Sequence, residues 1–200
     1  MDACCEVREV PRAQRRVLYL VLWINVAMFL VESVAGVMAH STALLADSVD
    51  MLGDATVYGF SLYVIGRGVA WQARAAMVKG VIMAAFGVGV VAQVVVKVAQ
   101  GLTPTVEVMS GVGVLALAAN LLCLVFLSRR RGDDINMRSA WICSRNDVIG
   151  SVGVLVAAGA VALTGSPWPD IAVGLAVAGV FGRSAAQVIR EASRAGAVAS

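Results

Sequence analysis

The stretch STALLADSVDMLGDA covers residues 41–55 and opens an apolar segment that continues to residue 66. It belongs to a set of six apolar segments, at residues 17–38, 42–66, 75–99, 106–128, 137–163 and 170–190. Each is close to the ~20 residues that a helix needs to cross a bilayer. The segments lack the alternation of a membrane β-strand, and lipid tolerates only helices and closed barrels. The sequence therefore predicts an all-α, polytopic membrane protein with six transmembrane helices.

The composition agrees with this fold class. The chain has 200 residues, of which 60% are hydrophobic and 14% charged, whereas soluble domains have roughly 45–50% apolar and ~25% charged residues. Six spans with short connections use nearly the whole length, which excludes a large soluble catalytic domain. The net charge is +3 and the basic residues are dispersed, so we expect no nucleic-acid partner. The four cysteines have neither disulfide nor zinc-finger spacing, and we expect them to be reduced.

The distribution of basic residues predicts the orientation, because cytoplasmic loops are enriched in Lys and Arg. Arginines gather before the first segment, between the second and third, between the fourth and fifth, and after the sixth. The opposite side receives only Lys97, so we expect both termini in the cytoplasm. The predicted regions are a cytoplasmic N-terminal tail at 1–16, a six-helix transport domain at 17–190 and a cytoplasmic C-terminal tail at 191–200.

Polar side chains within the apolar segments are the functional signal, because ionisable groups inside a bilayer are costly and usually line a site or an ion path. Asp47, Asp50 and Asp54 follow one another at steps of three and four residues, so they share one helix face within ~60°. Cys143 and Asp147 are four residues apart on another helix, with Asn146 beside them. Seven residues separate two more polar groups on one face of the first helix, Asn25 and Glu32.

These groups suit a metal ion. Closely spaced carboxylates repel one another in a low dielectric, and a divalent cation would resolve that conflict. Two i,i+4 pairs from two helices could converge on a tetrahedral ion such as Zn²⁺. The mixed oxygen and sulfur donors favour a transition metal over Mg²⁺ or Ca²⁺. The candidate ligands are Asp50, Asp54, Cys143 and Asp147, and the candidate accessory residues are Asp47, Asn146, Asn25 and Glu32.

The same residues also have structural interpretations. The aspartates could cap a helix or pair with Lys79 or Arg145, and Asp47 fits a helix end as well as a ligand. Cys143 by itself is typical of a small buried hydrophobic residue, and we expect Cys123 to serve packing. The four-residue spacing between Cys143 and Asp147 favours the ligand interpretation at this point.

Several segments, in order along the chain, resemble the cation diffusion facilitators, a family of metal transporters. These are the Asn25 to Glu32 spacing, STALLADSVDMLGDA at 41–55, ARAAMVKG at 73–80, LTPTVEVM at 102–109, NMRSAW at 136–141, DVIGSVGVLVAA at 147–158 and WPDIAVGLAVA at 168–178. The two aspartates of the second segment, joined to the aspartate pattern of the fifth, are the specific part. The resemblance covers nearly the whole chain.

The resemblance implies a six-helix exporter that moves divalent metals out of the cytoplasm in exchange for protons, usually as a dimer. It places the ion between the second and fifth helices, on Asp50, Asp54 and Asp147, with Cys143 where relatives have His or Asp. The expected substrate is a divalent transition metal, Zn²⁺ first, with Cd²⁺, Co²⁺, Ni²⁺, Fe²⁺ and Mn²⁺ as alternatives. The expected location is the inner membrane of a bacterium.

Three expectations concern assembly and alternatives. The chain ends ten residues after residue 190, so we expect it to lack the cytoplasmic metal-sensing domain of most relatives. A homodimer would then form through helix faces, where small residues permit close packing: Gly153, Ala157, Ala178 and Gly182. A membrane sensor that binds metal without transport stays open as an alternative, whereas an intramembrane hydrolase with paired aspartates lacks any supporting motif.

Overall fold

The fold is entirely helical in the part of the chain that the structure describes. The structure is a computed structural model, and it describes residues 12–63, 69–129 and 135–198. These ranges contain no strand, and their helices are α1 (Arg12–Met38), α2 (Thr42–Tyr63), α3 (Val69–Gln100), α4 (Val106–Ser128), α5 (Ile135–Thr164) and α6 (Trp168–Val198). Each predicted segment is therefore a helix, and the all-α class is confirmed.

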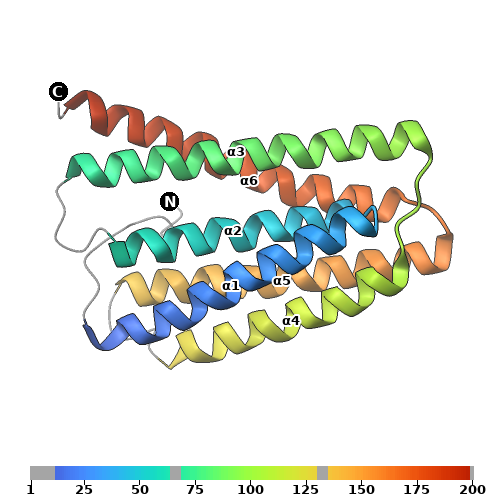
Figure 1. Cartoon of the computed structure of the whole chain (residues 1–200), viewed down its shortest axis with the longest axis horizontal. Helices are drawn as coiled ribbons and strands as arrows, with labels where there is room; N and C mark the ends of the chain where they lie inside the picture. Colours follow the sequence, from blue (N-terminus) through green and yellow to red (C-terminus); the bar gives the residue numbers. More distant parts are fainter. Residues whose placement is uncertain (1–11, 64–68, 130–134, 199–200) are drawn as a thin grey trace.

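The helices lie alongside one another and alternate in direction (Figure 1). The connections at 39–41, 101–105 and 165–167 lie at one end of the bundle, which we call the outer end. Gly101 and Gly165 follow α3 and α5 there with φ of 63° and 64°, a left-handed conformation that favours glycine at helix C-termini. This connectivity agrees with the predicted topology, and the orientation in a membrane stays a prediction.

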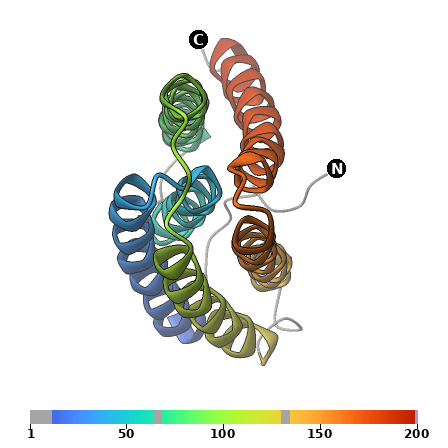
Figure 2. The same ribbon diagram turned by 90° about the vertical axis from the view of Figure 1, so that its right-hand side faces the viewer.

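Helix α2 lies at the centre of the bundle. It packs against α1, α3, α5 and α6, while α4 packs against α1 and α5. Helices α3 and α6 pair with one another and stand beside the group formed by α1, α2, α4 and α5 (Figure 2). A polar side chain on α2 can therefore be enclosed on several sides, which is where the sequence places the three aspartates.

Three helix boundaries differ from the predicted segments by five residues or more. Helix α3 begins at Val69 and includes residues 71–74, which the sequence assigns to a break. Helix α6 continues to Val198, through the predicted C-terminal tail. Both extensions contain Ala, Arg, Gln or Glu and no proline, so they have high helix propensity despite their polarity. Helix α1 begins at Arg12, within the predicted N-terminal tail.

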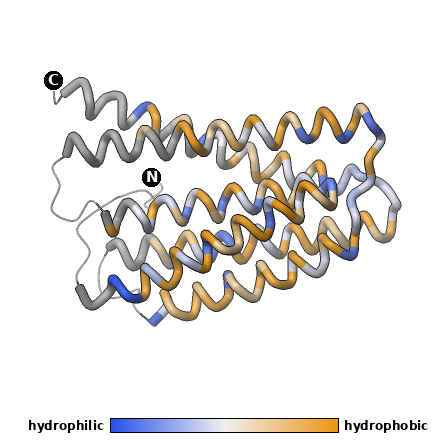
Figure 3. Tube along the Cα trace, viewed as in Figure 1, coloured by the Kyte–Doolittle hydropathy of each residue, from blue (hydrophilic) through white to orange (hydrophobic). Residues whose placement is uncertain are grey.

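The surface of the bundle is apolar and part of its interior is polar, the reverse of a soluble domain. Large apolar side chains point outward on several helices, including Trp23, Val88 and Leu163, which are 66%, 69% and 89% exposed. Hydrophobic residues dominate most of the length of the helices (Figure 3). The buried polar residues include Asn25, Glu32, Asp47, Asp54, Asn120, Asp147 and Ser151. This distribution fits a membrane protein.

Among the described residues, three helices are long and apolar enough to cross a membrane: Arg15–Met38, Val106–Ser128 and Ala140–Thr164. Helix α2 carries three carboxylates within eight residues, which lowers its hydropathy. Helices α3 and α6 contain shorter apolar stretches, Ala84–Gln100 and Trp168–Val180. Six helices are therefore observed, and six membrane crossings stay a prediction.

Small residues assigned to a dimer interface are partly used within the chain. Gly153 faces α6, where an added Cβ would lie 3.6 Å from Val173 Cγ1. Ala157 is 1% exposed and belongs to the core, and Ala178 is half-buried. Gly182 is exposed. The buried Ala157 is therefore used in packing within the chain, Gly153 faces α6, and a dimer through helix faces stays a prediction.

A buried ion pair joins α3 and α6 at the outer end. Lys97 and Asp170 both have fully buried side chains, and Lys97 Nζ donates a hydrogen bond to Asp170 Oδ2 at 2.5 Å. Lys97 Nζ also donates to the carbonyl oxygen of His40, at 2.8 Å. The sequence places Lys97 among the loop charges, and the pair is not foreseen there. The signal in the sequence was Asp170, which has the opposite charge and belongs to a segment that begins at the same end of the bundle.

Asp170 also caps the first turn of α2. Its two carboxylate oxygens accept hydrogen bonds from the backbone N–H groups of Thr42 at 2.7 Å and Ala43 at 3.1 Å. The hydroxyls of Ser41 and Thr42 donate to the same carboxylate, each at 2.6 Å. A negative charge at a helix N-terminus satisfies unpaired N–H groups and interacts favourably with the helix dipole. Asp170 thereby fixes the start of α2 relative to α3 and α6.

Candidate metal centre

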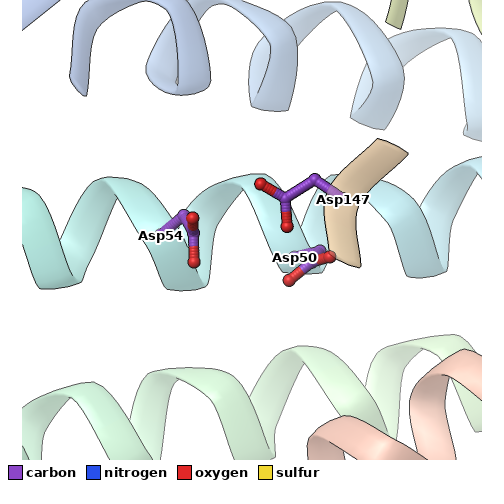
Figure 4. Close-up of side chains that lie close together, drawn as sticks. All are labelled: Asp50, Asp54 and Asp147. Carbon is purple, nitrogen blue, oxygen red and sulfur yellow. The ribbon is translucent and has the colours of Figure 1, made fainter. Parts of the chain in front are cut away.

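Three carboxylates from two helices meet in the interior of the bundle. Asp50 and Asp54 come from α2 and Asp147 comes from α5, and one oxygen from each lies within 4.8 Å of the others. Figure 4 shows the Asp147 side chain reaching toward the stretch of α2 that carries Asp50 and Asp54. Asp54 and Asp147 are buried and Asp50 is half-buried. The structure thus brings together three of the four predicted ligands.

The local sequence explains this convergence. Asp50 and Asp54 are four residues apart, so they project from adjacent turns of one helix face. Helix α5 is held against that face by Ser151, whose hydroxyl donates to Asp47 Oδ2 at 3.2 Å. Ser151 is four residues after Asp147, and therefore lies one turn from it on the same side of α5. The Ser151 contact places Asp147 next to α2.

Hydrogen bonds from helix α4 support the contact between α5 and α2. Asn120 Nδ2 donates to Ser151 Oγ at 2.9 Å, and Ser144 Oγ donates to the carbonyl oxygen of Asn120 at 3.4 Å. Asn120, Ser144 and Ser151 are buried. A chain of hydrogen bonds therefore runs from α4 through α5 to α2, and fixes the spacing between the helices that carry the carboxylates.

Tyr58 is a member of the site that was not predicted from the sequence. It is 2% exposed, and its hydroxyl donates to Asp54 Oδ2 at 2.8 Å. The hydroxyl is also within electrostatic reach of Cys143 and Asp147. The available signal was spacing, because Tyr58 follows Asp54 by four residues and so continues the aspartate stripe. Tyr58 thereby orients the carboxylate of Asp54.

Cys143 lies beside this group without joining it. It is half-buried, one helical turn before Asp147 on α5. Its sulfur is not among the ligand atoms that lie within 4.8 Å of one another. The assignment of Cys143 as the fourth ligand stays a prediction. Cys123, by contrast, is buried with Leu18 and Leu127, which confirms its packing role.

The accessory residues divide into two groups. Glu32 and Asn25 are buried on α1, and Asp47 is buried on α2. Glu32 lies one helical turn before Gly36, which packs against Leu45, so Glu32 and Asp47 lie at similar heights on the α1–α2 contact. Asn146 is exposed, because the step of one residue from Asp147 turns it by about 100° around the helix. The structure does not bring Asn146 into the group.

Arg145 does not reach the carboxylates. It is exposed, and its guanidinium lies 5.6 Å from the ring centroid of Trp141, a cation–π arrangement. The side chain of Lys79 lies outside the described residues. Three carboxylates in a shared interior position repel one another, since the effective dielectric there is far below that of water. Their arrangement can bind a divalent cation, whose charge relieves this repulsion.

Comparisons with known proteins agree with this chemistry. A family model described as "Cation efflux transmembrane domain" matches residues 18–195. The "Metal cation efflux system protein CzcD" of Cupriavidus metallidurans strain CH34 is 28% identical over 181 residues, which cover 84% of this chain and 57% of that protein. The "Cation efflux system protein CzcD" of Alcaligenes sp. strain CT14 matches to the same extent.

A third relative is more distant. The "Cadmium, cobalt and zinc/H(+)-K(+) antiporter" of Bacillus velezensis strain FZB42 is 22% identical over 194 residues, which cover 90% of this chain and 62% of that protein. The chain therefore spans about three fifths of the length of these curated relatives. The family model, at residues 18–195, includes most of each of the six helices.

Proposed function

Since the chain belongs to the cation efflux family, we propose that it exports divalent transition-metal cations from the cytoplasm in exchange for protons. The observation that carries this proposal is the meeting of Asp50, Asp54 and Asp147 in the interior of an apolar-surfaced bundle. Two helices supply these ligands, so a relative movement of α2 and α5 would change the site. Alternating access would expose the site first to the cytoplasm and then to the other side.

The proposed substrates are Zn²⁺, Cd²⁺ and Co²⁺, with Ni²⁺, Fe²⁺ and Mn²⁺ as alternatives. The printed name of the Bacillus velezensis relative includes cadmium, cobalt and zinc, which supports the first three. The donor chemistry agrees, because a site of three carboxylates and the nearby Cys143 thiol suits borderline to soft ions. In this proposal Cys143 moves toward the carboxylates when the metal binds and completes a tetrahedral site.

Proton exchange follows from the ligands themselves. Carboxylates and a thiol bind a metal in their deprotonated forms, so protons and metal compete for the same atoms. Protons that enter from the outer side would displace the ion there, and the empty protonated site would return them to the cytoplasm.

The arginine distribution supports cytoplasmic termini, and the bacterial relatives support an inner-membrane location. We further propose a homodimer through exposed helix faces.

The test is uptake by purified protein in liposomes with an imposed proton gradient, with each of the six metals in turn. We expect saturable uptake of Zn²⁺, and loss of uptake when Asp147 is replaced by Asn. The matched control is Glu107→Gln, since Glu107 is an exposed carboxylate at the start of α4. Metal binding without gradient-driven uptake would instead favour a membrane sensor or accessory protein.

A further inference from the structure

A second group of polar atoms lies between α1 and α2, outside the three-carboxylate group. Glu32 is 0% exposed and Asp47 is 1% exposed. Both carboxylate oxygens of Glu32 and Oδ1 of Asp47 are buried without a hydrogen-bond partner among the described residues. A buried polar atom without a partner is costly, and a buried charge without one is more so. Such atoms require an explanation that helix packing does not supply.

The position of this group relates it to the first site. Asp47 precedes Asp50 by three residues on α2, about 4.5 Å along the helix axis toward the outer end. Gly36, one helical turn after Glu32, packs against Leu45, two residues before Asp47. Asp47 therefore lies on the outer side of the three-carboxylate group, with Glu32 at a similar height across the α1–α2 contact. An ion that leaves that group toward the outer end meets Asp47 and Glu32 next.

Helix α5 packs closely against Asp47. Helix α5 has a glycine beside it, and a Cβ added at Gly150 would lie only 2.9 Å from Asp47 Oδ1. Any larger residue would crowd that unpartnered oxygen. The other oxygen, Oδ2, is oriented by Ser151. One oxygen of Asp47 thus accepts a hydrogen bond, while the second lies against Gly150 without a hydrogen-bond partner among the described residues.

We propose that Glu32 and Asp47 form a second position for the transported divalent cation, on the outer side of the Asp50–Asp54–Asp147 group. This inference rests on the proposed function and adds an exit step to it. Two carboxylates balance the charge of one divalent ion. The donors are oxygen atoms, which hold Zn²⁺ or Cd²⁺ less strongly than a site that includes a thiolate. A weaker position next to a stronger one allows the ion to move outward and be released.

The experiment counts bound ions by equilibrium dialysis of the purified full chain in detergent, with Zn²⁺ as the probe. It uses a background of Cys4→Ser and Cys5→Ser, because this vicinal pair of thiols could bind Zn²⁺ independently. We expect two ions per chain, one tight and one weaker. Glu32→Gln and Asp47→Asn, which retain the side-chain shapes, should each weaken the second ion at least tenfold. The control Glu107→Gln should leave both ions unchanged.

The outcomes separate this inference from the proposed function. One ion per chain in the background protein, or two undiminished ions in both Glu32→Gln and Asp47→Asn, would overturn the second position and leave the first intact. Loss of the tight ion in Asp147→Asn supports the first site, whereas its retention would count against the proposed function itself. Helical circular dichroism and gel filtration identify any variant that fails to fold, and the other variant then decides the result.

Discussion

Replacing Asp170 by Asn should lower the free energy of unfolding of the bundle more than most substitutions at the candidate metal centre. Asn keeps the shape of Asp but carries one oxygen and one amide nitrogen. In the wild type one oxygen accepts from Thr42 N and Thr42 Oγ1, and the other accepts from Ala43 N and Ser41 Oγ. Either orientation of the new side-chain amide therefore sets an N–H donor against a backbone N–H. The substitution also leaves the buried ammonium of Lys97 without its negative partner.

The magnitude follows from these losses. Removing one partner of a buried ion pair costs about 3–5 kcal/mol, because the other charge stays buried without compensation. Lys97→Met should cost less, about 1–2 kcal/mol, because Asp170 keeps its donors at the start of α2. In the double variant no unpaired ammonium is left. Its loss should therefore be smaller than the sum of the two single losses by about 2 kcal/mol, as expected for residues in contact.

Equilibrium unfolding in mixed detergent and SDS micelles, followed by circular dichroism, measures these differences in the free energy of unfolding. A suitable control is Lys97→Met alone, which removes the ion pair while keeping the α2 cap. The reasoning would be refuted if Asp170→Asn lay within about 0.5 kcal/mol of the wild type, the range of ordinary surface substitutions. Strict additivity of the two single losses would also refute it.

Three further predictions concern the site and its packing. Asn at Asp50, Asp54 or Asp147 should abolish metal uptake in liposomes while membrane insertion is retained; wild-type rates in all three variants would contradict the ligand assignment. Tyr58→Phe removes the hydrogen bond to Asp54 and should lower the free energy of unfolding by about 1–2 kcal/mol, with a changed Zn²⁺ affinity; an unchanged unfolding curve would argue against this role. Gly174→Ala puts a Cβ 2.7 Å from the Thr42 carbonyl carbon and should cost about 1–3 kcal/mol in the same assay. Gly179→Ala, which meets nothing within 4 Å, is its control and should be nearly neutral.

The helices could be predicted from the sequence because each is a continuous apolar run bounded by polar or glycine-containing breaks. The 106–128 segment agrees with α4 at both ends, where Pro104 and a cluster of arginines flank it. The largest boundary errors fall at α3 and α6, where polar residues continue the helix beyond the apolar run. Hydropathy identifies the part of a helix that can lie in lipid, while helix propensity determines how far it continues outside.

The partners of buried polar groups could not be predicted in the same way. The Lys97–Asp170 pair joins residues that are 73 positions apart, and the Asp47–Ser151 contact joins residues 104 apart. Periodicity along one helix identifies which side a residue faces, but it gives neither the order of helices in the bundle nor their relative height. The sequence therefore predicted the polar stripes of α2 and α5, whereas the hydrogen bonds between helices depend on tertiary packing.

Cys143 illustrates the limit of spacing as a predictor of ligands. Its position four residues before Asp147 predicts the same face of α5, yet its sulfur is not among the ligand atoms that lie within 4.8 Å of one another. One helical turn also separates the two residues by about 6 Å along the axis. A cysteine side chain is shorter than a histidine side chain, so it spans less of the gap to α2. Cys143→His should therefore retain Zn²⁺ binding with a lower relative preference for Cd²⁺, and Cys143→Asp should shift the preference from Cd²⁺ toward Mn²⁺. Competition assays with paired metals on the purified variants measure both effects. An unchanged order of metals in these variants and in Cys143→Ser would assign the thiol to packing and leave the three carboxylates as the protein's metal ligands.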